Sequence, residues 1–163
     1  MAGFEYRQAA EIRDAMARHG VRYLFIGKAG AVLLGFPDTT QDADLFVARD
    51  AENCRSLIAA LSELGFQLTA TENDQILWGK DFVQLKNGPF DLDLIFAPDG
   101  IERFDDAWRR RAEVDRFPVC HMDDIIASKA ATNRRKDQES LPRLRAFRDY
   151  WLANPPPGQS IGD

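Results

Sequence analysis

The sequence is poor in the residues that build disulfide frameworks and zinc sites. Its 163 residues include only two cysteines and two histidines, and Cys54 and Cys120 lie far apart, outside any Cys-x-x-Cys spacing. Buried or incidental thiols are therefore the expected state of both cysteines, and a zinc site would lack ligands. No Ser/His/Asp or Cys/His arrangement typical of nucleophilic catalysis stands out.

Long hydrophobic runs are also missing. No apolar stretch approaches the roughly 18 to 20 residues that cross a bilayer. The first residues, Met1 to Arg7, lack the basic and then apolar composition of a signal peptide, so a cytoplasmic protein without membrane contact is expected. The formal net charge of -5 excludes a uniformly basic nucleic-acid-binding surface but allows a local basic patch.

Helical and strand patterns alternate along a chain of ordinary composition, 45% hydrophobic and 29% charged. The predicted helices cover 5–18, part of 27–35, 51–64, 102–110, 122–133 and 138–152. The predicted strands cover 21–26, 44–48, 66–71, 76–78, 81–86 and 90–96, with a short extended piece over 114–119. Asn87-Gly88 predicts a hairpin between the last two strands. Pro142 is expected in the first turn of the last helix.

This pattern predicts a mixed fold. Helices at both ends and one clear hairpin favour an α+β (mixed α/β) class, with a mixed β-sheet flanked by helices. A single domain is expected over residues 1–153, since 163 residues suffice for one compact core. Residues 154–163 contain a run of prolines and are expected to form a disordered tail.

Two Asp-x-Asp pairs lie at predicted strands. Residues two apart in extended backbone project to the same side, so Asp42 neighbours Asp44, and Asp91 neighbours Asp93. Neighbouring carboxylates repel each other unless one is protonated or a cation lies between them, and Mg²⁺ is the usual cation with phosphate substrates. A single pair is more simply explained by an acidic solvent face. The presence of two pairs favours a metal site.

Gly27 ends the first predicted strand, fifteen residues before Asp42. A glycine at this point lets the backbone approach a ligand, and the start of the following helix offers free N–H groups to phosphate. Many glycines at such positions only form a turn. The combination with a downstream Asp-x-Asp pair is more specific, and it favours a phosphate-binding site.

These features resemble the nucleotidyltransferase superfamily, in the branch that contains AbiEii-type toxin-like transferases and related uncharacterised bacterial domains. The resemblance covers about residues 20–150. It rests on the order and spacing of the segments Phe25 to Gly35, Thr40 to Leu45, Leu92 to Ile95, Met122 to Lys129 and Arg134 to Asp137.

The resemblance implies a nucleotidyltransferase-type sheet with C-terminal helices, and a metal-dependent transfer of a nucleoside monophosphate from a nucleoside triphosphate. The implied catalytic residues are Asp42, Asp44, Asp93 and Lys129, and the implied nucleotide-binding residues are Gly27, Lys28, Thr40 and Asp137. Asp42, Asp44 and Asp93 would hold Mg²⁺ or Mn²⁺, with Asp91 the less favoured third ligand. The acceptor stays open between tRNA, a protein hydroxyl and a small molecule, and a toxin–antitoxin setting is an analogy.

Lys28 departs from the family pattern, which has a second small residue at this position. A lysine keeps the backbone N–H and could reach phosphate directly. It could equally fill the phosphate position and pair with Asp42 or Asp44, leaving an inactive nucleotide- or partner-binding module of the same fold. A metal-dependent phosphoesterase is a third option. The basic run 134–136 fits either a surface for RNA or phosphate, or a solvated helix end.

Overall fold

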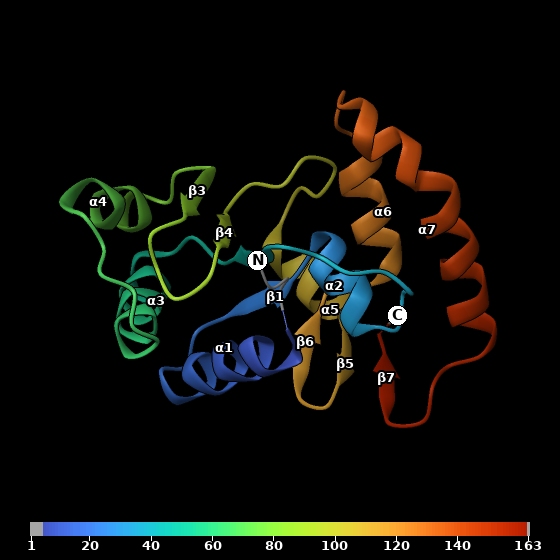
Figure 1. Cartoon of the computed structure of the whole chain (residues 1–163), viewed down its shortest axis with the longest axis horizontal. Helices are drawn as coiled ribbons and strands as arrows, with labels where there is room; N and C mark the ends of the chain where they lie inside the picture. The colour runs from blue at the N-terminus through green and yellow to red at the C-terminus, as the bar shows by residue number, and fades with distance from the viewer. Residues whose placement is uncertain (1–4, 163) are drawn as a thin grey trace.

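The computed structural model describes residues 5–162, which form a mixed α+β fold around one seven-stranded sheet. The helices are α1 (Tyr6–Arg18), α2 (Gly27–Leu33), α3 (Ala51–Glu63), α4 (Ala70–Trp78), α5 (Phe104–Arg110), α6 (Met122–Ala130) and α7 (Arg135–Ala153). The strands are β1 (Tyr23–Phe25), β2 (Ala43–Val47), β3 (Phe82–Leu85), β4 (Leu92–Ile95), β5 (Ala112–Val114), β6 (Phe117–Val119) and β7 (Gln159–Ile161). In Figure 1, α6 and α7 lie side by side at one end of the molecule and α3 and α4 at the other. No helix among these residues is long and apolar enough to cross a bilayer.

The sheet has the strand order β3-β4-β2-β1-β6-β5-β7 and is mixed, as the sequence predicted. Strand β2 runs antiparallel to β1 and parallel to β4. The β2–β4 register places Asp44 directly opposite Asp93. The predicted hairpin is confirmed, since β3 pairs antiparallel with β4 and places Gln84 opposite Asp93.

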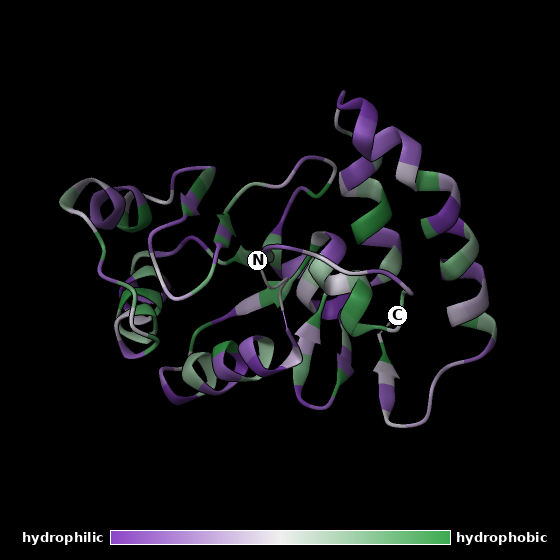
Figure 2. Cartoon of the chain, in the orientation of Figure 1, coloured by the Kyte–Doolittle hydropathy of each residue, from purple (hydrophilic) through white to green (hydrophobic). Residues whose placement is uncertain are grey.

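Amphipathic patterns account for the helices that cover the sheet. The inner face of α1, formed by Ala9, Ile12, Ala15 and Met16 within the predicted helix, is fully buried. The alternation of hydrophobic and hydrophilic residues along α1 is visible in Figure 2. Because burial of one such stripe removes it from water, the stripe fixes which side of the helix meets the sheet.

The predicted strands over 66–71 and 76–78 are wrong, because residues 70–78 form α4. The side-chain oxygen of Thr69 accepts a hydrogen bond from the backbone N–H of Glu72 (3.1 Å), and the Glu72 carboxylate accepts one from the N–H of Thr69 (2.9 Å). This capping box starts the helix, and Gly79 ends it in a left-handed conformation with φ 73°. A short apolar run does not by itself distinguish a strand from a helix.

The expected single extended piece over 114–119 is a β-hairpin instead. Strands β5 and β6 pair antiparallel, and the turn between them holds Asp115 and Arg116 at positive φ angles of 49° and 64°. Aspartate tolerates this left-handed region better than most residues, but arginine gives no such signal in the sequence. The turn was therefore not recognisable from composition.

Helix α7 starts at Arg135, earlier than predicted, so Pro142 lies in the helix interior and not in the first turn. A proline there removes one backbone N–H from the helical ladder. Leu141, Leu144 and Trp151 of the same helix are buried, as predicted, and this packing offsets the loss.

The expected disordered tail is also partly wrong. Residues 159–161 form β7, which pairs antiparallel with β5. Trp151 donates a hydrogen bond to the Gln159 side chain (2.8 Å), which in turn donates to the Leu34 carbonyl (3.2 Å). These contacts between distant segments hold the strand after the prolines, and Asp163 lies outside the described residues.

The capping box makes a prediction for α4. Replacing Thr69→Ala removes the side-chain acceptor and should lower the free energy of unfolding by about 1 kcal/mol. Thr71→Ala, at an exposed position inside the same helix, should be nearly neutral. Urea unfolding monitored by circular dichroism measures both, and equal effects of the two substitutions would argue against the cap.

Candidate active site

All eight residues that the sequence predicted for the site line one cleft of about 340 Å³. The cleft lies between the edge formed by β2, β3 and β4 and the residues of α2, α6 and the start of α7. The predicted residues lining it are Gly27, Lys28, Thr40, Asp42, Asp44, Asp93, Lys129 and Asp137. The structure adds Phe82, Gln84, Ser128, Thr132, Arg134 and Lys136 to this lining.

Asp44 and Asp93 form the acidic centre of the cleft. Burial raises the pKa of the Asp44 carboxyl to about 8. The charge of Asp93 and its hydrogen bond raise this pKa further, whereas the positive charge of Lys129 lowers it. Burial also raises the pKa of Asp93, although hydrogen bonds with Asp44 and Gln84 oppose the rise. Asp93 is only 9% exposed, and its Oδ1 atom has no hydrogen-bond partner. Unpartnered buried carboxylate oxygens are costly, so this pair has capacity for a proton or a cation.

The structure distinguishes Asp93 from Asp91. Asp91 precedes β4 and does not line the cleft, and its backbone carbonyl accepts a hydrogen bond from the N–H of Ala43 (3.3 Å). Asp42 precedes β2 and does line the cleft, where its charge raises the pKa values of Asp44 and Asp93. Within residues 5–162, no three His, Cys, Asp or Glu side chains are gathered closely enough to hold a metal ion by themselves.

Gly27 lies directly against Asp44. Its φ angle is 66°, and a Cβ atom placed on it would lie 2.5 Å from Asp44 Oδ2. The backbone N–H of the preceding Ile26 donates to the Asp44 carbonyl (2.9 Å). The sequence predicted a glycine for close approach to a ligand, and the structure shows close approach to the acidic centre itself.

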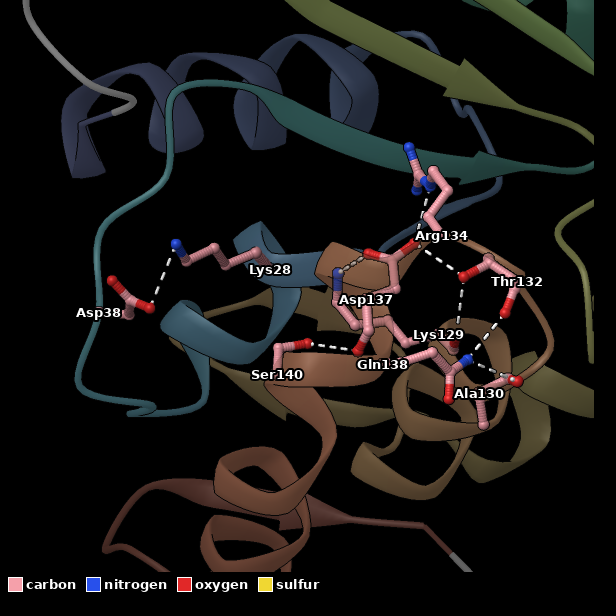
Figure 3. A network of polar contacts seen from close by, with 9 residues as sticks. All are labelled: Lys28, Asp38, Lys129, Ala130, Thr132, Arg134, Asp137, Gln138 and Ser140. Carbon is pink, nitrogen blue, oxygen red and sulfur yellow. Dashed lines mark hydrogen bonds and ion pairs between the residues drawn. The ribbon is translucent and has the colours of Figure 1, made fainter.

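Lys28 does not pair with Asp42 or Asp44. Its ammonium lies 3.2 Å from Asp38, on the loop between α2 and β2, and Figure 3 shows its side chain extended toward that loop. Thr40, on the same loop, donates its hydroxyl to the Asp42 carbonyl (3.2 Å). The contact that would fill the acidic centre with a lysine is therefore not formed.

Lys129 belongs to a polar network around the buried carboxylate of Asp137, at the junction of α6 and α7 (Figure 3). Asp137 is 4% exposed and lies 3.4 Å from the Lys129 ammonium, while the Thr132 hydroxyl and the Arg134 guanidinium each donate to it at 2.8 Å. Burial raises the pKa of Asp137, but Thr132, Lys129 and Arg134 together outweigh burial and leave it lowered. Asp137 is thus a charged group that lies within ion-pair distance of Lys129.

Several residues of the lining were missed in the sequence. Thr132 lies just after α6, where a single polar residue carries no periodic signal. Gln84 could have been found only from the β3–β4 register, which places it opposite Asp93. Arg134 and Lys136 were part of the basic run, and both line the cleft although their side chains are exposed to solvent.

In comparison with known proteins, this chain matches no family model and no curated protein sequence. The chemistry of the cleft therefore rests on its own residues. They place Asp44, Asp93 and Asp42 together with several cationic side chains around one space.

The raised pKa of Asp44 predicts a pH-dependent stability. Between about pH 4 and pH 8 the folded state keeps a proton that the unfolded state has released, so stability falls as pH rises through this interval. Asp44→Asn removes the titration and should flatten the dependence of the melting temperature on pH, measured in EDTA. Asp91→Asn is the control, and a wild-type curve parallel to that of Asp44→Asn would contradict the shifted pKa.

The position of Gly27 gives a second prediction. Gly27→Ala introduces a Cβ that collides with Asp44, whereas Gly20→Ala has the same φ of 66° and nothing within 4 Å of the added atom. Both variants carry the backbone strain of about 1 kcal/mol, and Gly27→Ala should lose roughly 1–3 kcal/mol more. Denaturant unfolding compares them, and equal losses would show that the approach to Asp44 is not tight.

Proposed function

We propose that this protein is a metal-dependent nucleotidyltransferase that moves a nucleoside monophosphate from a nucleoside triphosphate to an acceptor. The observation that carries the proposal is the pairing of the half-buried Asp44 with the buried Asp93, in a cleft that also holds Lys129, Arg134 and Lys136. Phosphoryl-type transfer depends mainly on positioning and on neutralising charge, and this cleft combines acids for a cation with cations for phosphate.

The acidic pair fits a divalent cation such as Mg²⁺ or Mn²⁺. The unpartnered Oδ1 of Asp93 and the raised pKa of Asp44 both indicate carboxylates that the nearby charge of Lys129 does not fully neutralise. Mg²⁺ is commonly held by one or two carboxylates together with substrate phosphates, so a complete protein cage is not required. Asp44 and Asp93 would hold the ion, with Asp42 beside them, and the ion would supply neutralisation of phosphate charge.

The remaining residues have separate roles in the proposal. Lys129, oriented by Asp137, contributes a fixed positive charge next to the acidic pair. Arg134 and Lys136 contribute further positive charge along the cleft toward α7. Gly27 brings the backbone against Asp44 and leaves the space beside it free of a side chain. The acceptor hydroxyl would lose its proton to one of the ionised carboxylates of the cleft.

An inactive binding module of the same fold receives less support. That alternative depended on Lys28 occupying the acidic centre, and Lys28 pairs with Asp38 instead. The acceptor, whether tRNA, protein or small molecule, and any toxin–antitoxin role follow from the resemblance alone and stay open.

Calorimetric titration with each of the four nucleoside triphosphates, with and without Mg²⁺, tests the proposal. At least one should bind in a magnesium-dependent manner. Asp93→Asn should weaken that binding by about tenfold or more, because it removes a ligand charge, whereas Asp91→Asn should change it by less than about twofold. The two substitutions alter the same residue type two positions apart, and only Asp93 lines the cleft.

The absence of heat with every nucleotide would overturn the proposal. Magnesium-dependent binding without release of pyrophosphate, in the presence of RNA, protein and small-molecule acceptors, would instead favour the binding module. If Asp93→Asn and Asp91→Asn weakened nucleotide binding equally, the Asp44–Asp93 pair would not be part of the nucleotide-binding site.

A further inference from the structure

A second, smaller pocket opens beside the cleft, between α2, the loop after it and α7. It has a volume of about 70 Å³, and a single water needs only about 10–15 Å³ on this measure. There is therefore room for a group the size of one phosphate. The residues lining it are Lys28, Phe36, Asp38, Lys129, Lys136, Asp137, Ser140, Arg143 and Leu144.

The charges of this side pocket are unbalanced. Four cationic side chains face two carboxylates in its lining. One of the two, Asp137, is buried and already engaged by Lys129, Thr132 and Arg134. Asp38 is therefore the carboxylate that is left to neutralise the pocket's outer cations.

Asp38 occupies the position that an external anion would take. Its Oδ2 lies 3.2 Å from the Lys28 ammonium and 3.6 Å from the Arg143 guanidinium, and its Oδ1 accepts from the Thr39 N–H at 2.7 Å. The Thr39 N–H and then Lys28 lower the pKa of Asp38, so it carries its charge at neutral pH. One loop carboxylate thus links a lysine of α2 to an arginine of α7.

The ion pairs that Asp38 makes with Lys28 and Arg143 are weak enough for another anion to replace Asp38. The side chains of Lys28, Asp38 and Arg143 are 39%, 27% and 61% exposed, and exposed ion pairs contribute only about 0–1 kcal/mol. Arg143 would stay in place without Asp38, because its guanidinium lies over the Phe36 ring, 5.1 Å from the centroid, and contacts the Pro37 carbonyl at 3.5 Å. The Arg143 guanidinium therefore stays beside Lys28 when Asp38 leaves, so both cations can bind another anion.

We infer that the side pocket is a binding site for a phosphate group, and that Asp38 is a built-in counter-ion which the phosphate displaces from Lys28 and Arg143. A phosphate carries up to two negative charges on one group and matches the excess of cations better than a single carboxylate does. The pocket shares Lys28, Lys129, Lys136 and Asp137 with the cleft, but Asp44 and Asp93 do not line it, so binding there needs no divalent cation. The inference does not rest on the proposed nucleotidyl transfer.

The test is calorimetric titration of the full chain with inorganic pyrophosphate, one of whose two phosphate groups fits the pocket, in EDTA at constant ionic strength. Asp38→Asn keeps an acceptor for Thr39 and removes the competing charge, so it should tighten pyrophosphate binding by about tenfold. Arg143→Ala should weaken it by a similar factor. Asp149→Asn and Arg145→Ala make the same charge changes on exposed positions of α7 outside the pocket, and each should change the affinity by less than about twofold.

The inference is overturned if Asp38→Asn binds pyrophosphate no more tightly than Asp149→Asn does, or if Arg143→Ala has no larger effect than Arg145→Ala. A competition titration then identifies the source of the phosphate. Competition between pyrophosphate and a magnesium–nucleotide complex assigns the pocket to the nucleotide's terminal phosphates, and simultaneous binding assigns it to a free phosphate ligand. If no nucleotide binds at all, the transferase proposal fails while the pyrophosphate result still stands.

Discussion

The approach of Asp44 and Asp93, on adjacent parallel strands, is the constraint around which the cleft is arranged. Their register is set by the β2–β4 ladder, so neither carboxylate can move away without disturbing the centre of the sheet. Burial and mutual repulsion then favour a shared proton or a bound cation. Gly27 follows from the same constraint, because only a residue without a side chain leaves room for Asp44 at that distance.

The positive charges of the cleft are anchored away from this acidic pair. Asp137 holds Lys129 from the start of α7, and Asp38 holds Lys28 from the loop before β2. Each lysine thus has its own carboxylate partner, and Lys28 forms no ion pair with Asp42 or Asp44. The two anchors differ in burial, since Asp137 is enclosed and Asp38 is partly exposed. Lys129 is accordingly a fixed element of the cleft, and Lys28 is an exchangeable one.

The elements with a strong local pattern were predicted well. The buried stripe of α1 and the β3–β4 hairpin each follow from a few neighbouring residues. The failures occurred where a short segment fits two structures or depends on a distant partner. Residues 70–78 form α4 because Thr69 caps the helix. Pro142 is tolerated inside α7 because the helix packs against the core. Strand β7 forms because it pairs with the edge of β5.

For the site, the residues indicated two pairs of aspartates at predicted strands and a glycine turn ahead of the first pair. The resemblance then implied Lys28, Thr40, Lys129 and Asp137 and preferred Asp93 to Asp91, and all eight predicted residues are among those that line the cleft. The entry of Asp93, and not Asp91, into the cleft and the turn of Lys28 toward Asp38 became visible only in the folded chain. Strand register and loop path bring together residues far apart in the chain, and no local pattern encodes which of two neighbouring acids will meet a given partner.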